Sequence, residues 1–222
     1  MMIKKLALAA VVASALFSSS SYAEENMFYV KAEGGLNFFP ASKVTDTYAG
    51  GSMTTKFKSS MGGTAAVGVG YYVMENLRTE LSLKYPFISE AKANEKDSKS
   101  TFKPSSMGVF LKGCVDVYDF EVGKISIGAG LGWAQVSAEG SYVAADGQNV
   151  KYKLAKKNNI GFGAGTRVSY SISDAVALEV GYEWTMYGKP KDLVEKYLDK
   201  ETTTKSPSVQ THELAFGLRF AI

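Results

Sequence analysis

Alternation of large apolar residues with charged or small residues dominates this chain, most clearly over its last eleven residues. Between His212 and Ile222, the large apolar side chains alternate with Glu213, Ala215, Gly217, Arg219 and Ala221. A strand with one apolar face and one face of charges and glycines is typical of a strand that separates lipid from a polar lumen. The pattern therefore predicts a membrane-spanning β-strand at this end of the chain.

Seven further segments show the same period of two, and each is long enough to cross a bilayer as a tilted strand. They begin near Phe28, Met61, Leu77, Met107, Ile125, Ile160 and Val176. The connections are short at 73–76, 118–123 and 171–174, and long at 39–59, 88–101, 137–157 and 187–208. Short periplasmic turns and long external loops characterise outer-membrane barrels. The sequence predicts an all-β protein, an eight-stranded antiparallel up-and-down transmembrane β-barrel.

Outward-facing aromatic residues test this assignment, because they should gather where a barrel crosses the two membrane interfaces. The periplasmic ends of the predicted strands carry Phe28, Tyr71, Tyr170 and Phe220. The external ends carry Phe38, Tyr85, Phe87, Trp133 and Trp184. A soluble up-and-down barrel or sandwich with glycine-rich strands is the alternative, but it gives no reason for two aromatic girdles.

The first 23 residues have the pattern of a cleaved signal peptide. Lys4 and Lys5 precede an apolar run over 6–17, and small residues follow up to Ala23, as secretion signals require. We expect residues 1–23 to be the signal peptide and residues 24–222 the barrel domain, located in the bacterial outer membrane with loops at the cell surface. Without Lys4 and Lys5 the net charge of +3 falls to +1, which gives no reason to expect a nucleic-acid partner.

The predicted inward face carries six cations and six anions. They are Lys31, Glu33, Arg78, Glu80, Lys84, Lys112, Asp116, Arg167, Glu179, Glu183, Glu213 and Arg219. Eight strands enclose an interior that side chains can just fill, and a buried charge is costly unless it is paired. We therefore expect an ion-paired network that plugs the lumen, in preference to an open aqueous pore.

Residues for catalysis are scarce. The only histidine, His212, is expected at the external rim, and we find no Ser or Asp spaced to activate it. The single cysteine, Cys114, cannot form an internal disulfide and is expected to be a small inward-facing filler. The glycines of 161–165 lack the strand-to-helix context of a phosphate-binding loop. We expect no enzymatic activity, no catalytic residue, no cofactor and no metal site.

Three segments give the chain a resemblance to a known family. They are 70–81 (GYYVMENLRTEL), 182–189 (YEWTMYGK) and 217–220 (GLRF). In these segments the chain resembles the small outer-membrane adhesin family of rickettsiae, whose members look like opacity-type eight-stranded barrels. The resemblance implies surface exposure and attachment to host cells or host proteins. The three segments lie on predicted strands and a periplasmic turn, so they carry over no binding residue.

Adhesion would depend on the four long loops, where lysines recur. The candidate contact residues are Lys151, Lys153, Lys156, Lys157, Lys189, Lys191, Leu193 and Tyr197. The same lysines could instead form a solvated rim that faces lipopolysaccharide. Leu193, Val194, Tyr197 and Leu198 recur at helical spacing, which predicts a short external helix with an apolar face.

The expected function is therefore that of a surface adhesin that binds host cells, or a host surface or serum protein, from the lipid and lipopolysaccharide of the outer membrane. A structural barrel and a narrow porin-like channel for small solutes are the alternatives.

Overall fold

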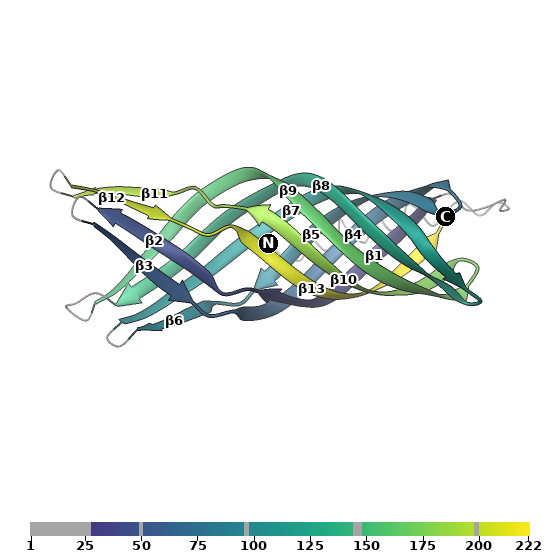
Figure 1. Ribbon diagram of the computed structural model, residues 1–222, viewed down its shortest axis with the longest axis horizontal. Coiled ribbons are helices and arrows are strands. Elements are labelled where there is room, and N and C mark those ends of the chain that lie inside the picture. The colour runs from purple at the N-terminus through teal and green to yellow at the C-terminus, as the bar shows by residue number, and fades with distance from the viewer. Residues whose placement is uncertain (1–27, 49–50, 96–97, 144–147, 198–199) are drawn as a thin grey trace, which may run out of the picture.

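The computed structural model describes residues 28–48, 51–95, 98–143, 148–197 and 200–222, and the signal peptide expected at 1–23 lies outside them. Eight of the strands form a closed barrel, in which each strand runs antiparallel to its neighbours and β13 returns to pair with β1 (Figure 1). They are β1 (Phe28–Phe39), β4 (Ser60–Met74), β5 (Leu77–Ile88), β7 (Ser98–Phe120), β8 (Gly123–Val143), β9 (Asn149–Ser173), β10 (Val176–Gly188) and β13 (Val209–Ala221). The predicted eight-stranded barrel is confirmed. In the described residues, no helix is long and apolar enough to cross a membrane.

Five shorter strands lie at the end of the barrel that carries the long connections, which we call the distal end. They are β2 (Ser42–Tyr48), β3 (Gly51–Phe57), β6 (Ala91–Glu95), β11 (Leu193–Tyr197) and β12 (Lys200–Lys205). A second sheet has the order β11-β12-β2-β3, whereas β6 pairs with the distal part of β7. We call these five strands, with residues 98–105 of β7, 135–143 of β8 and 149–157 of β9, the distal extension.

The distal extension corrects two expectations from the sequence. The four segments expected to be long loops are mostly β-hairpins and continuations of barrel strands. The helix expected from Leu193 onward is wrong, because 193–197 form β11, which pairs with β12 in a hairpin; Leu198 lies outside the described residues. The threonines of 202–204 favour extended structure in β12, and the pairing satisfies backbone groups that a short helix would leave open.

Side-chain polarity inverts where the barrel passes into the distal extension. Within the barrel, outward residues such as Leu131 are exposed and apolar, while the inward phase of the same strand β8 carries glycines and serine. Further along β8, the inward residues Ala134, Val136 and Ala138 are completely buried, and the outward Glu139 is exposed. Lipid favours apolar side chains outside, and water favours them inside. The inversion therefore marks the distal limit of the membrane-spanning part.

A β-bulge in β9 produces the same inversion on the neighbouring strand. The β8–β9 register shifts between Val136 and Ala138, so that Val136 lies opposite Lys157 and Ala138 lies opposite Leu154. The extra residue in β9 changes which side chains face inward. Leu154 is consequently buried, while Lys153 beside it is exposed.

A hydrophobic core fills the distal extension. The ring of Phe102 lies between those of Phe39 and Phe57, with centroid distances of 6.3 and 5.6 Å. Deeper in the molecule, the ring of Phe110 meets Tyr187 edge-on at 5.8 Å, and both are fully buried. Each buried side chain of this size contributes roughly 1.5–3 kcal/mol relative to an exposed one, so the extension is a folded unit with a core of its own.

The two sheets of the extension are joined near the barrel. On one side, the amide of Lys58 donates to the carbonyl of Lys92 at 3.0 Å, and on the other the amide of Lys191 donates to the carbonyl of Ala155 at 3.2 Å. Between these links, Gly188 takes a φ of +93°, and a Cβ there would lie 2.5 Å from the side chain of Asn159. Beyond the links, the two groups of hairpins separate toward the distal end (Figure 1).

Candidate functional site

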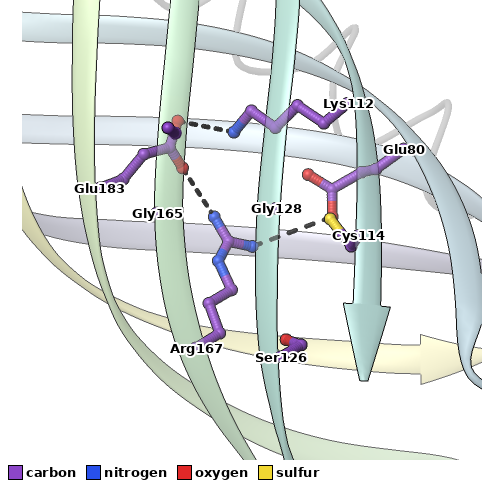
Figure 2. A pocket seen from close by; sticks show the side chains of 9 residues that line it. Glu80, Lys112, Cys114, Ser126, Gly128, Gly165, Arg167 and Glu183 are labelled. Atoms are coloured by element: carbon purple, nitrogen blue, oxygen red, sulfur yellow. Dashed lines mark hydrogen bonds and ion pairs between the residues drawn. The ribbon is translucent and has the colours of Figure 1, made fainter. Parts of the chain in front are cut away.

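The lumen of the barrel is built from the inward positions of all eight strands, and Glu183 on β10 lies at its centre. One carboxylate oxygen of Glu183 accepts from Lys84 Nζ at 2.9 Å and Lys112 Nζ at 2.6 Å, and the other lies 3.0 Å from Arg167 Nη2. Figure 2 shows the contacts with Lys112 and Arg167. Three cations from β5, β7 and β9 thus converge on one buried carboxylate, which connects β10 to β5 and β7, two strands with which it does not pair.

The other predicted lumen residues extend this network. Lys31 lies 2.6 Å from Glu80 and 3.2 Å from Glu33, and Arg167 reaches Glu33 at 2.8 Å. Further pairs are Lys84–Glu213 at 2.7 Å, Arg78–Asp116 at 2.6 Å, Arg167–Glu80 at 3.8 Å, and Glu179 with Arg167 and Arg219 at 3.5 Å each. The structure therefore brings all twelve residues into one interior, and each of them has at least one partner of opposite charge.

Several lumen residues were not singled out from the sequence. Tyr72 Oη accepts from Arg219 at 2.7 Å and from Arg78 at 3.3 Å, which links the outlying Arg78–Asp116 pair to Arg219. The guanidinium of Arg219 also lies 5.4 Å from the ring centroid of Tyr29. Both tyrosines occupy inward positions of their strands, so the alternation could have identified them as lumen residues. They are not among the cations and anions from which the lumen network was predicted.

The space left inside the network is small. A hollow of about 20 Å³ is lined by Glu80, Lys112, Cys114 and Arg167, among others (Figure 2). This is room for about one water molecule. On the distal side, Phe110 and Tyr187 cover the network. On the other side, a cavity of about 210 Å³ adjoins Tyr29, Tyr72 and Arg219.

The residues considered for catalysis are not assembled into a reactive group. His212 Nδ1 lies 2.6 Å from the hydroxyl of Tyr182, an outward-facing residue, whereas the neighbouring carboxylates of Glu183 and Glu213 are buried in the lumen. Cys114 is buried, and a Cβ on Gly128 would lie 2.7 Å from its sulfur. Among the described residues, no three His, Cys, Asp or Glu side chains are placed to hold a metal ion.

The candidate contact residues occupy different surroundings. The exposed ones are Lys151, Lys153, Lys156, Lys157, Lys189 and Lys191. Leu193 packs against the core of the extension. Tyr197 lies in β11 opposite Lys200, and its side chain is outside the described part. The extension therefore groups the four lysines of β9 on one hairpin, and it leaves Leu193 only partly exposed.

One ion pair modifies this basic surface. Lys153 Nζ donates to Glu139 on the paired strand β8 at 2.7 Å, and both side chains are exposed. The hydrogen bond from Lys153 lowers the pKa of Glu139, and the positive charge adds to this effect. Glu139 therefore offsets one of the four β9 lysines.

A second region missed by the sequence reasoning is a cavity of about 310 Å³ between the two sheets of the distal extension. Its walls include Val44 and Phe57 from the β2–β3 hairpin, Tyr142 and Tyr152 from β8 and β9, and Leu193 from β11. Burial raises the pKa of Tyr152 to about 12, with a further contribution from Asp46. The alternation of apolar and polar residues within 42–57 and 150–154 could have predicted the strands of these walls, but both segments were expected to lie in loops.

The sequence places this fold in a family. A family model for the outer membrane protein beta-barrel domain matches residues 9–220. The chain belongs to the outer-membrane β-barrel proteins. Within this family, it is 30% identical to a protein of Rickettsia prowazekii named as a candidate adhesin, over 99% of this chain and all of the relative. A protein of Rickettsia bellii with the same description is also 30% identical, over 99% of both chains.

Solved structures support the fold. The outer membrane protein OprG from Pseudomonas aeruginosa has a TM-score of 0.54 and 10% identity, over 88% of this chain and 97% of OprG. The outer membrane protein AlkL has a TM-score of 0.50 and 15% identity, over 93% of this chain and 95% of AlkL. The protein is thus an outer-membrane barrel, and its short turns and long hairpins place the distal extension at the cell surface.

Proposed function

We propose that this protein is a surface adhesin, which attaches the bacterium to a host surface or a host protein through its distal extension. The observation that carries the proposal is the construction of the extension, which projects from the barrel as a folded unit with its own core. A rigid platform loses little conformational entropy when it binds a partner. The names of the full-length rickettsial relatives, candidate adhesins, support the same function.

Within the extension, the lysines of β9 are the proposed contact surface. Lys151, Lys153, Lys156 and Lys157 are exposed on one hairpin, and only Lys153 has an ion-pair partner among the described residues. A group of like charges on a projecting surface accelerates association with a partner of opposite charge. The lumen is the less suitable contact surface, because its charges form ion pairs with each other inside the barrel.

The test uses bacteria that display the protein and measures their attachment to host cells. Changing Lys153, Lys156 and Lys157 to Glu should reduce attachment, and raising the ionic strength from 0.1 to 1 M should weaken wild-type attachment as the Debye length falls from about 10 to about 3 Å. The matched control changes Lys43, Lys56 and Lys58, which are exposed on the β2–β3 hairpin or next to it, to Glu. Attachment that is the same for both variants and wild type would contradict the proposal.

A further inference from the structure

The cavity of about 310 Å³ lies between the β11-β12-β2-β3 sheet and the distal ends of β7, β8 and β9. Its volume is at the lower end of the roughly 300–1,000 Å³ of small-molecule sites. All of its lining residues belong to the distal extension, at the cell-surface end of the molecule. A molecule from outside the cell could therefore reach it without crossing the membrane or the lumen.

One part of the wall is apolar and aromatic. Val44 and Phe57 are almost completely buried beneath the cavity. The rings of Tyr142 and Tyr152 lie beside it with centroids 6.4 Å apart. The ring of Tyr152 fits because Gly140 has no side chain, since a Cβ there would lie 2.3 Å from its hydroxyl oxygen. The two rings provide a surface for the C–H face of a small ring.

The wall also has a polar part, which is not strongly charged. Asp46 accepts a hydrogen bond from Thr204, and the other polar residues are mainly hydroxyl side chains: Thr55, Ser100, Ser141 and Thr202. Lys151 is exposed and contributes the cation among the lining residues. The cavity thus combines two aromatic rings with one carboxylate and several groups that can both donate and accept hydrogen bonds.

This composition discriminates between classes of ligand. An alkyl chain would pack on the aromatic rings, but it would offer no hydrogen-bond partner to the hydroxyls or to the second carboxylate oxygen of Asp46 in place of the water it displaces, which is costly. Asp46 would repel a sulfated or phosphorylated ligand and Lys151 would attract it, so the two charges together give such a ligand no net advantage. A neutral sugar ring has C–H groups to pack on the tyrosines and hydroxyls to donate to the carboxylate. We propose that this cavity binds a neutral pyranose residue, presented by a glycan of the host surface if the adhesin function holds.

The test measures binding of methyl glycosides of glucose, galactose, mannose and their N-acetylated amines to the full protein in lipid nanodiscs, by saturation-transfer NMR. We expect at least one of them to bind with a Kd on the order of 1 mM, as suits a ligand of this size. Asp46→Asn should weaken binding about tenfold, because a charged acceptor becomes a neutral one. Tyr142→Ala should also weaken it. Tyr48→Ala is the matched control, since Tyr48 is similarly exposed on β2 but does not line the cavity.

The comparison ligands are 1-hexanol and a sulfated hexose. Preferential binding of hexanol would overturn the proposal in favour of an apolar site, and preferential binding of the sulfated sugar would overturn it in favour of the lysine surface. The absence of saturation by any neutral glycoside would also overturn it. Equal loss of binding in Tyr48→Ala and Tyr142→Ala would overturn the assignment to this cavity.

Attachment assays separate this proposal from the adhesin function. If the bound glycoside competes with attachment to host cells, the sugar belongs to a host glycan. If glycosides bind but attachment is unchanged, the cavity proposal stands and its sugar comes from the bacterial surface polysaccharide. If displayed bacteria do not attach at all but glycosides still bind, the adhesin proposal fails alone. If displayed bacteria attach to host cells but no glycoside binds, the cavity proposal fails and the adhesin function stands.

Discussion

At the scale of single residues, the lumen depends on a few side chains that each neutralise several others. Glu183 is the clearest case, because Lys84, Lys112 and Arg167 all contact its carboxylate. Removing one partner of a buried ion pair leaves a charge uncompensated, which costs more than the pair itself stabilises. A residue with three such partners should therefore be among the most sensitive positions in the barrel.

We predict that Glu183→Gln, which keeps the size of the side chain but removes its charge, lowers the free energy of unfolding by about 3–5 kcal/mol. Urea-induced unfolding in lipid vesicles would measure this loss. Glu139→Gln is the matched control, because Glu139 also pairs with a lysine but is exposed to solvent. It should unfold like wild type, since exposed pairs contribute little. Equal effects of the two substitutions would show that the network around Glu183 is not desolvated.

At the scale of strands, the two faces of each element were predictable within the membrane-spanning part. On β13, for example, Leu214, Phe216 and Leu218 are exposed and Glu213 is buried, as the alternation indicates. In this part of the chain, lipid lies outside every strand, so the apolar positions of the alternation always face outward and the polar positions always face the lumen.

The distal extension was not predictable in the same way, because its surroundings change from lipid to water. The inward phase of β8 continues from glycines to Ala134, Val136 and Ala138, while its outward phase becomes polar. In β9, the bulge also shifts the phase. The apolar residues of 193–197 suited both a helix and a strand, and the choice depended on pairing with β12, which is itself held by β2. The local periodicity of a sequence does not predict such long-range contacts.

The polarity inversion predicts that an arginine introduced at two outward positions has different effects on stability. Leu218 on β13 lies opposite Ala32 and Leu178, within the membrane-spanning part. Leu218→Arg should destabilise the barrel by about 2–4 kcal/mol, the cost of a cation on the lipid face near the middle of the bilayer. A reduced fraction of folded protein on a heat-modifiability gel would report it.

The control for Leu218→Arg is Ser105→Arg. Ser105 is also exposed, but it lies on β7 beyond the point where polarity inverts. We expect this variant to fold like wild type, because its new side chain enters water. If Ser105→Arg is the more damaging of the two, the boundary between lipid and water has been placed wrongly.

At the scale of the whole molecule, three layers follow one another along the barrel axis. A cavity of about 210 Å³ near Arg219 is followed by the ion-paired network, and then by the core that begins at Phe110 and Tyr187. The two inner layers block ions by different means. Paired side chains of the network surround a hollow of only about 20 Å³, and the layer of Phe110 and Tyr187 is mainly aromatic and offers few groups to replace the water around an ion.

This order predicts how the lumen behaves in planar bilayers. Wild-type protein should show at most small, infrequent conductance, because both layers are intact. Neutralising Arg78 or Glu80 alone should loosen only the network, and the layer at Phe110 should keep the lumen dry. Combining Glu80→Gln with Phe110→Ala should produce a clear increase in conductance, because it weakens both layers. Large, stable channels from the wild-type protein would contradict the closed lumen and favour a porin-like role. Conductance in Glu80→Gln as large as in the double variant would show that the ion pairs alone hold the barrel closed.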